Sequence, residues 1–158
     1  MIQTAILLSI APTYAERILS GAKSVELRRI RPRISKGDLM LVYVSAPKKE
    51  LRAVAIVEGV LAKEPGQLWT AIKQRTGMTT TEFSEYFAGA SIGYAIMFHS
   101  VHELESPVSL SNLRFLWPGF HPPRSHRYFS QKDVEKLCLP ASIMPAIDKN
   151  NDNQCNSV

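Results

Sequence analysis

The sequence predicts a small α+β domain in which five or six strands form one mixed sheet, curled toward a barrel, beside three or four short helices. The 158 residues match the length of one ordinary domain. Apolar and charged shares of 45% and 21% are typical of a globular protein. Short apolar runs alternate with short amphipathic runs, as in a sheet with covering helices. We expect residues 1–140 to form this single domain and the polar residues 141–158 to form a frayed tail.

Apolar or alternating runs predict the strands, at residues 2–10, 23–30, 39–45, 51–61 and 90–104. The run 23–30 alternates, with Val25 and Leu27 on one face and Glu26 and Arg28 on the other. An Arg-Pro-Arg tripeptide ends this strand, and a bend is expected near Gly93 in the last run.

Prolines and capping residues predict the helices. Pro12 suits the first turn of a helix that ends near residue 21, and Pro65 opens a second helix. Thr79 and Glu82 have the spacing of a capping box, which predicts a third. Ser130 caps a last short helix that ends near residue 137. Residues 106–127, rich in proline, serine and arginine, are expected to form an ordered loop.

Nothing in the sequence predicts export or a membrane partner. The N-terminal apolar run of about seven residues lacks a basic flank and a cleavage signal. No apolar run approaches the roughly 18 residues of a membrane span. Cys138 and Cys155 have the spacing of neither a disulfide framework nor a zinc site, so both are expected to be free thiols. The protein is therefore expected to be cytoplasmic.

The basic charge is concentrated in one segment. Net charge is +5 and the pI is about 9.4. Residues 23–36 hold six basic residues against one acid, Glu26, so this segment alone carries a charge of +5, equal to the net charge of the chain. The basic residues are Lys23, Arg28, Arg29, Arg31, Arg33 and Lys36. A solvated strand edge guarded by charge would explain them, but most are arginine, the better fork for phosphate. Arg29, Arg31 and Arg33 alternate with apolar residues, so we expect them to point together at a nucleic-acid backbone.

The stretch from residue 6 to 45 resembles the ASCH domain of the PUA-like superfamily. The resemblance rests on the strand LLSI, the helix starting Pro-Thr-Tyr, the pattern Gly21-x-Lys23-x-x-Glu26-x-Arg28, a Gly-Asp turn and the strand LVYVS. The segment 122–128, PPRSHRY, is similar to that of bacterial ASCH proteins described as predicted transcriptional regulators. The resemblance covers most of residues 4–137.

This resemblance implies a small PUA-like mixed barrel with a cleft beside the first helix for RNA or a modified nucleoside. ASCH proteins that are enzymes include amidohydrolases acting on N(4)-acetylcytidine and at least one ribonuclease. The amidohydrolases use a lysine, a threonine and a glutamate. Lys23 lies where their lysine lies, and the region of their glutamate falls near Thr76. Glu26 stands in place of their threonine, which departs from that pattern.

Lys23 and Glu26 are the candidate catalytic pair if the protein is an enzyme, because a carboxylate beside a lysine can tune proton transfer. Their spacing puts them on opposite faces of a regular strand, so they meet only if Lys23 precedes the strand or a bulge intervenes. The alternative is a structural ion pair at the barrel mouth.

Other residues are candidates for nucleic-acid binding. Tyr43 and Ser45 end a predicted strand where the cleft of the family would open. Arg124, Ser125 and Arg127 form a second basic loop, which either closes over a ligand or ties the last helix to the barrel. Base stacking needs exposed rings, and the candidates are Tyr14, Tyr43, Trp69, Tyr94 and Tyr128, although Trp69 lies on an apolar helical stripe.

No metal or cofactor is expected. The four histidines lack metal-ligand spacing, and the sequence has neither a glycine-rich phosphate loop nor a G-x-S-x-G elbow. The leading hypothesis is an RNA-binding ASCH module with a basic cleft for a backbone segment or a single base. The alternative is a hydrolase acting on RNA or a modified nucleoside. A DNA-binding transcriptional regulator is a second alternative, although no basic helix-turn-helix pattern supports it. The oligomeric state is not predicted.

Overall fold

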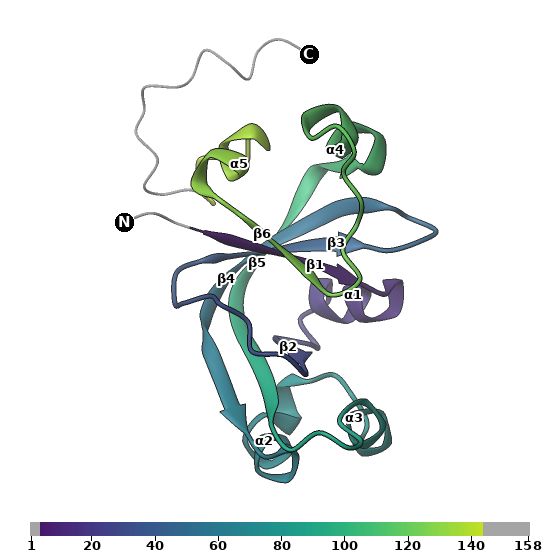
Figure 1. Cartoon of the computed structure of the whole chain (residues 1–158), viewed down its shortest axis with the longest axis vertical. Helices are drawn as coiled ribbons and strands as arrows, with labels where there is room; N and C mark the ends of the chain where they lie inside the picture. The colour runs from purple at the N-terminus through teal and green to yellow at the C-terminus, as the bar shows by residue number, and fades with distance from the viewer. Residues whose placement is uncertain (1–3, 144–158) are drawn as a thin grey trace.

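The computed structural model describes residues 4–143, in which six strands form one curled mixed sheet in the order β2-β5-β4-β3-β1-β6 (Figure 1). β1 runs parallel to β3, and the other neighbouring pairs are antiparallel. The strands are β1 (Ala5–Ile10), β2 (Val25–Arg28), β3 (Leu39–Val44), β4 (Glu50–Lys63), β5 (Gly93–Ser109) and β6 (His126–Phe129). The predicted mixed sheet of five or six strands is thus confirmed.

Within residues 4–143, five α-helices and one 3₁₀ turn accompany the sheet, against the three or four short helices predicted. They are α1 (Pro12–Leu19), α2 (Pro65–Ile72), the 3₁₀ turn η1 (Lys73–Arg75), α3 (Thr80–Tyr86), α4 (Leu110–Leu116) and α5 (Gln131–Lys136). The predicted starts at Pro12 and Pro65 are confirmed. Thr79 and Glu82 form the predicted capping box of α3, and Ser130 caps α5.

The prediction of a loop over residues 106–127 is wrong. β5 continues to Ser109, whose hydroxyl then caps α4 by accepting the backbone N–H of Asn112 at 3.1 Å. β6 begins at His126 and pairs antiparallel with β1. A four-residue strand with polar residues is too short to show an alternating pattern in the sequence. Its strand conformation depends on pairing with a partner more than a hundred residues away.

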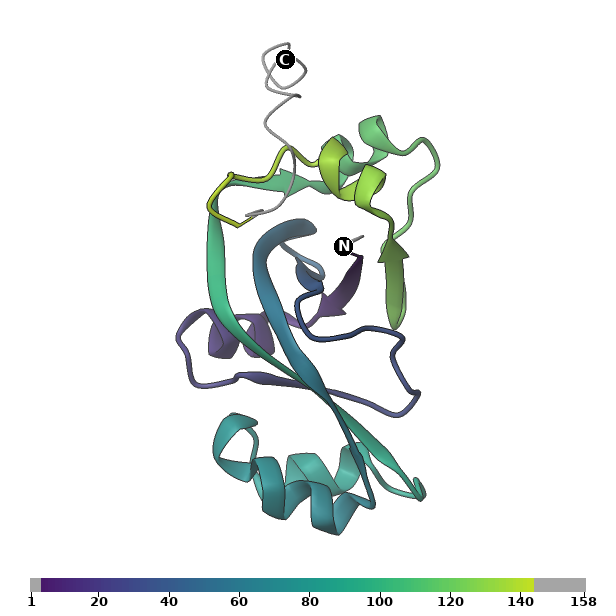
Figure 2. The ribbon, with the colours of Figure 1, turned by 90° about the vertical axis from the view of Figure 1, so that its left-hand side faces the viewer.

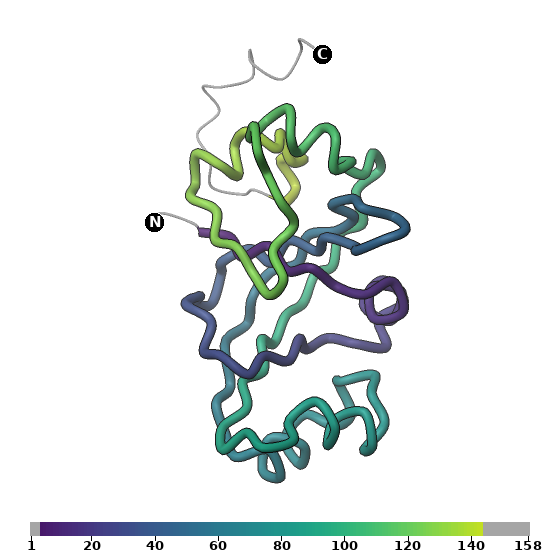
Figure 3. The backbone as a smooth tube through the Cα atoms, turned by 45° about the vertical axis from the view of Figure 1, so that its right-hand side comes forward, coloured from purple at the N-terminus to yellow at the C-terminus, as the bar shows by residue number. Residues whose placement is uncertain are grey.

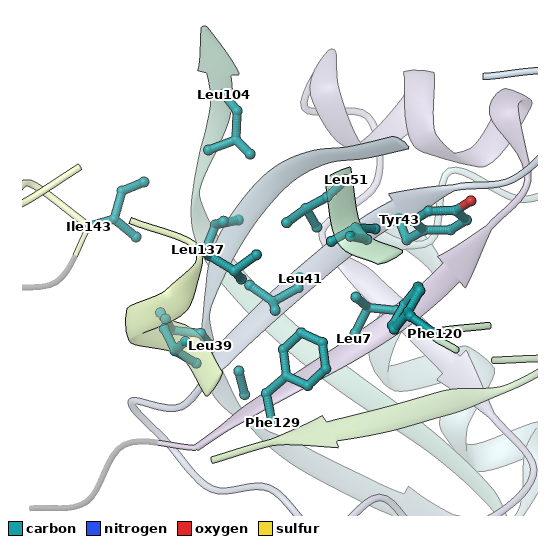
Figure 4. Close-up of a cluster of buried hydrophobic side chains, with 14 residues drawn as sticks. Leu7, Leu39, Leu41, Tyr43, Leu51, Leu104, Phe120, Phe129, Leu137 and Ile143 are labelled. Atoms are coloured by element: carbon teal, nitrogen blue, oxygen red, sulfur yellow. The ribbon is translucent and has the colours of Figure 1, made fainter. Parts of the chain in front are cut away.

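Three apolar clusters hold the elements together. Above the sheet, α4 and α5 cover Leu7, Leu41, Phe129 and their neighbours (Figure 4). Below it, Ala15 and Ile18 of α1 pack against the opposite face of β1, β3 and β4. A third cluster packs α2 and α3 against β2 and the N-terminal end of β5. This end projects beyond the curled part of the sheet (Figures 2 and 3).

The expectation of free thiols is wrong for Cys138, which is disulfide-bonded. Pairing depends on the distance between two cysteines in the fold, which their spacing in the sequence does not give. Cys155 and most of the predicted tail lie outside the described residues. Within residues 4–143, no helix is long and apolar enough to cross a membrane.

Gly93 at the start of β5 is a position where only hydrogen fits. A Cβ there would lie 2.8 Å from the Phe87 ring and 2.9 Å from Leu68, both buried. We predict that Gly93→Ala lowers the free energy of unfolding by about 1–3 kcal/mol through overpacking, as measured by urea denaturation. Gly66→Ala in α2 is the matched control, because open space surrounds that position. Equal stability of Gly93→Ala and wild type would contradict this account.

Candidate functional site

A cavity of about 370 Å³ lies between β2 and the helices on either side of it. Its lining comes from α1 (Tyr14), from β2 and the residues before it (Lys23, Glu26, Leu27), and from α3 and the turn that precedes it (Met78, Glu82, Glu85, Tyr86). α1 and α3 flank β2 at this point of the fold (Figures 1 and 3). The cavity thus lies between the curled sheet and the helical layer below it.

Lys23 is a buried cation in the wall of this cavity, with 3% of its side chain exposed. It precedes β2, which is the condition under which it can approach Glu26. Its Nζ donates to the backbone oxygen of Thr76 at 3.2 Å and lies 4.0 Å from Glu26 Oε2. Burial lowers the pKa of Lys23, Glu26 opposes this shift, and the nearby cations Arg17 and Arg28 add to it.

The turn that supplies the Thr76 carbonyl is tied to the sheet. Arg75 pairs with Glu58 on β4, at 3.1 and 3.2 Å, and donates to Ser24 and to the backbone oxygen of Phe98. Gly77 has φ +59°, and a Cβ there would approach Lys23 to 3.2 Å. Arg75 and Gly77 therefore fix the position of the acceptor that Lys23 uses.

Glu26 and Arg28 form an ion pair beside Lys23. Arg28 Nη2 lies 3.2 Å from Glu26 Oε1, and Arg28 Nη1 donates to the backbone oxygen of Ser125 at 3.2 Å. Glu26 Oε2 and Arg28 Nε are both buried and have no hydrogen-bond partner. Lys23 also bonds only one acceptor within residues 4–143. The cavity wall therefore keeps unused donors on Lys23 beside an unused acceptor on Glu26.

Aromatic rings and carboxylates complete the cavity. The Tyr14 ring lies 5.4 Å from Lys23 Nζ and 5.1 Å from Arg17 Cζ. The Tyr86 hydroxyl donates to the backbone oxygen of Leu27 at 2.9 Å, and burial raises the pKa of Tyr86. The sequence did not point to Met78, Glu82, Glu85 or Tyr86, although the capping box that starts α3 could have marked this helix.

The arginines of the basic segment do not point together, contrary to the prediction. Arg29 Nη1 donates to two backbone oxygens at the C-terminal end of α3, those of Tyr86 at 2.7 Å and Ala88 at 3.1 Å. Arg31 lies over the Tyr94 ring at 5.3 Å, and Arg33 over the Tyr128 ring at 5.1 Å. Each guanidinium follows a different neighbour because the segment leaves the sheet after Arg28. Lys36 is exposed beside Gly37.

Tyr43 lies away from the cavity, which differs from the expectation that it borders the cleft. It is 1% exposed and packs in the cluster above the sheet (Figure 4). Tyr43 pairs in register with Ser9 of β1, and the two hydroxyls are buried without a hydrogen-bond partner. Burial raises the pKa of Tyr43, and the charge of Arg114 partly offsets this shift. Ser45 follows β3 and donates its backbone N–H to Ile10.

The second basic loop is divided between a loop and β6. Arg124 is exposed in the loop, whereas Arg127 lies within β6 over the rings of Phe120 and Phe129, at 5.0 and 5.5 Å. β6 begins at His126, the register partner of Leu8, and continuing this antiparallel register by one residue sets Ser125 opposite Ser9. We call Tyr43 on β3, Ser9 on β1 and Ser125 just before β6 the hydroxyl row, although the Ser125 hydroxyl itself lies 3.0 Å from His126 Nδ1. No group of three potential metal ligands occurs in the part of the chain that the structure describes.

Comparison with known proteins finds relatives similar to this chain in sequence and in structure. An ASCH domain-containing ribonuclease of Zymomonas mobilis is 25% identical over 130 residues, which are 82% of this chain and 87% of that protein. The crystal structure of ASCH from Zymomonas mobilis superposes with a TM-score of 0.80 at 24% identity, over 85% of this chain and 93% of that one. Its variants with a tyrosine replaced by phenylalanine and a serine by alanine give TM-scores of 0.80 and 0.79. The ASCH, PUA-like fold is thereby confirmed.

The sequence also matches a family over a continuous segment that runs from β1 to the end of α4. The segment spans residues 3–116 and includes every residue that lines the cavity. Because the match extends over well more than half of the chain, the protein belongs to the family described as Domain of unknown function (DUF365).

Proposed function

We propose that this protein binds RNA and that the cavity at Lys23 holds one unpaired base. The observation that carries the proposal is the unused hydrogen-bonding capacity of Lys23 and Glu26, side by side in a cavity with two tyrosines. The Watson–Crick edge of each base presents an acceptor next to a donor, which an ammonium and a carboxylate can pair. The name of the Zymomonas mobilis relative, a ribonuclease, supports RNA as the partner.

The charges around the cavity favour a base over a phosphate inside it. Three carboxylates line it, those of Glu26, Glu82 and Glu85, against the single ammonium of Lys23. Arg28 forms an ion pair with Glu26, and Arg17 forms one with Glu82, so the charges of these two carboxylates are balanced. A phosphate group would meet Glu85 without gaining a free guanidinium, so the backbone is better placed outside the cavity.

Arg31 and Arg33 are suited to that backbone. Each guanidinium lies on an aromatic ring, and within residues 4–143 neither donates a side-chain hydrogen bond. A ring below a guanidinium limits its movement while leaving its N–H donors available to phosphate. By contrast, Arg28 and Arg29 already bond backbone carbonyls.

The first prediction for RNA binding concerns these two arginines. Replacing both, Arg31→Glu and Arg33→Glu, should weaken binding of single-stranded RNA at least about tenfold at low salt. It should also flatten the slope of log affinity against log salt by about 1.4, since two phosphate contacts are lost. Filter binding over a salt series measures both quantities. Lys132→Glu on α5 is the matched charge-reversal control, and an unchanged slope in the double variant would remove these arginines from the interface.

The second prediction concerns Lys23. Lys23→Met should weaken binding of a short single-stranded oligonucleotide by about ten- to a hundredfold, the value of one or two hydrogen bonds from a charged donor. Calorimetric titration measures the affinity, and a circular dichroism melt checks that the variant folds. Wild-type affinity in a folded Lys23→Met protein would mean that the cavity does not hold the base.

The third prediction follows from the lowered pKa of Lys23. An amine with a lowered pKa loses its proton, and with it the charge that strengthens its hydrogen bonds, at a lower pH than an ordinary lysine. RNA affinity should therefore fall as the pH rises through this lowered pKa. An oligonucleotide of adenosine and cytidine is the probe, because its bases keep their protons in this range. The fall should be absent in Lys23→Met, and an equal fall in both proteins would assign it to another group.

RNA cleavage is a second candidate function, and the hydroxyl row of Tyr43, Ser9 and Ser125 is the observation that favours it. The Zymomonas mobilis ASCH structure has been solved with a tyrosine and a serine replaced, the residue types that the row brings together. The raised pKa keeps the Tyr43 hydroxyl protonated, so it could donate a proton to a leaving oxygen. Arg127 on β6 could hold the phosphate.

The fourth prediction separates cleavage from binding. If the row is catalytic, Tyr43→Phe should lower the rate of RNA cleavage by at least about a hundredfold and leave RNA affinity unchanged. A gel assay with end-labelled RNA measures the rate. Binding without any cleavage by the wild type would leave the protein as a binding module. Preferential binding of duplex DNA in a competition assay would instead support the transcriptional regulator.

A further inference from the structure

Side chains, not a strand ladder, join the two edge strands of the sheet. β2 and β6 stand at opposite ends of the strand order. Arg28 Nη1 reaches across to the backbone oxygen of Ser125 at 3.2 Å, and the backbone N–H of Arg33 donates to the Tyr128 hydroxyl at 2.8 Å. Arg28 thereby holds the segment that precedes β6, including the Ser125 end of the hydroxyl row.

The Glu26–Arg28 pair is incomplete in this arrangement. Only Nη2 of Arg28 and Oε1 of Glu26 are bonded, while Nε and Oε2 are buried without partners. A buried polar atom without a partner destabilises the arrangement that leaves it unpaired. Nε and Nη2 lie on the same side of a guanidinium, so a side-on fork from Nε and Nη2 to both carboxylate oxygens would satisfy the two atoms at once.

Two attractions oppose this fork. Lys23 Nζ lies 4.0 Å from Glu26 Oε2 and draws that oxygen toward the cavity. The Ser125 carbonyl draws Arg28 in the opposite direction, toward β6. The observed geometry is therefore a balance between a fork that pairs the buried atoms and two contacts that pull its partners apart.

We propose that Arg28 has two positions and couples the cavity to the hydroxyl row. In one position it bridges Glu26 and Ser125, as observed; in the other it forms the side-on fork with Glu26 and releases Ser125. A ligand that draws the Lys23 amine away from Glu26 favours the fork. Each carboxylate oxygen has two acceptor positions, so Glu26 Oε2 can accept from the ligand and from Arg28 Nε at once. Release of Ser125 then loosens the segment beside the row, where Tyr43 is otherwise buried. This inference rests on the proposed function for its ligand but not for its test.

His126 reports the position of Arg28. The groups that face its ring are Arg28 from β2, Arg33 from the following loop, Ser125 Oγ at 3.0 Å and the Tyr128 ring at 5.1 Å. Burial lowers the pKa of His126, and the charges of Arg28 and Arg33 add to this shift. When Arg28 turns toward Glu26, its charge moves away from the imidazole, so the pKa of His126 should rise.

The test is an NMR titration of the His126 ring in proteins without any RNA. Lys23→Gln removes the charge that draws Glu26 Oε2 but keeps a donor for the Thr76 carbonyl, and Lys23→Met serves as a second variant. The pKa of His126 should rise in both and stay unchanged in Lys23→Arg, which keeps the charge. Amide spectra confirm folding in each variant.

Arg28→Met completes the cycle. His126 should titrate at higher pH in Arg28→Met alone, and adding Lys23→Gln to it should produce no further change. A His126 titration that is the same in wild type and Lys23→Gln would overturn the coupling, as would an equal shift in the presence and absence of Arg28. Because these measurements need no RNA, a failure of RNA binding leaves their outcome intact, and a failed coupling leaves RNA binding to be measured separately.

Discussion

The long pairing of β4 with β5 is the constraint on which the rest of the fold depends. These strands have 14 and 17 residues, and their register shifts in three places. Such irregularities bend a ribbon and increase its twist. One end of the ribbon therefore curls with β3 and β1, while the other projects with β2 and carries α2 and α3 (Figure 2). The cavity exists because β2 lies where these two parts diverge.

Burial of Lys23 at this point requires a chain of compensating charges. Lys23 faces Glu26, Glu26 bonds Arg28, and Arg28 bonds a backbone carbonyl. Removing one member would leave a buried charge without its partner. The excess charge of residues 23–36 therefore overstates what is available to a phosphate, because part of it stabilises the fold. Only the arginines beyond Arg29 and the exposed Lys36 remain available.

Local signals explain what the sequence predicted correctly. Prolines and capping boxes predicted where α1, α2, α3 and α5 begin. Lys23 precedes β2, which is one of the two conditions under which the sequence allowed it to meet Glu26. Long-range contacts explain the rest. β6 exists only beside β1, and the α3 wall of the cavity depends on how Phe83 and Phe87 pack against β2 and β5. The sequence around Tyr43 would look the same whichever face of the sheet borders the cavity, so it could not show that Tyr43 lies on the other face.

Closing the sheet with side chains, not with a ladder, has a consequence for stability and for function. A β2–β6 ladder would satisfy backbone groups and fix the distance between the edges. Here the closure depends on Arg28 and Arg33, and it leaves Arg28 Nε and Glu26 Oε2 buried without partners. Departures of this kind from full pairing concentrate at functional sites. Glu26 lines the cavity and Arg28 reaches the open edge, so this incompletely bonded ion pair is placed to respond to a ligand.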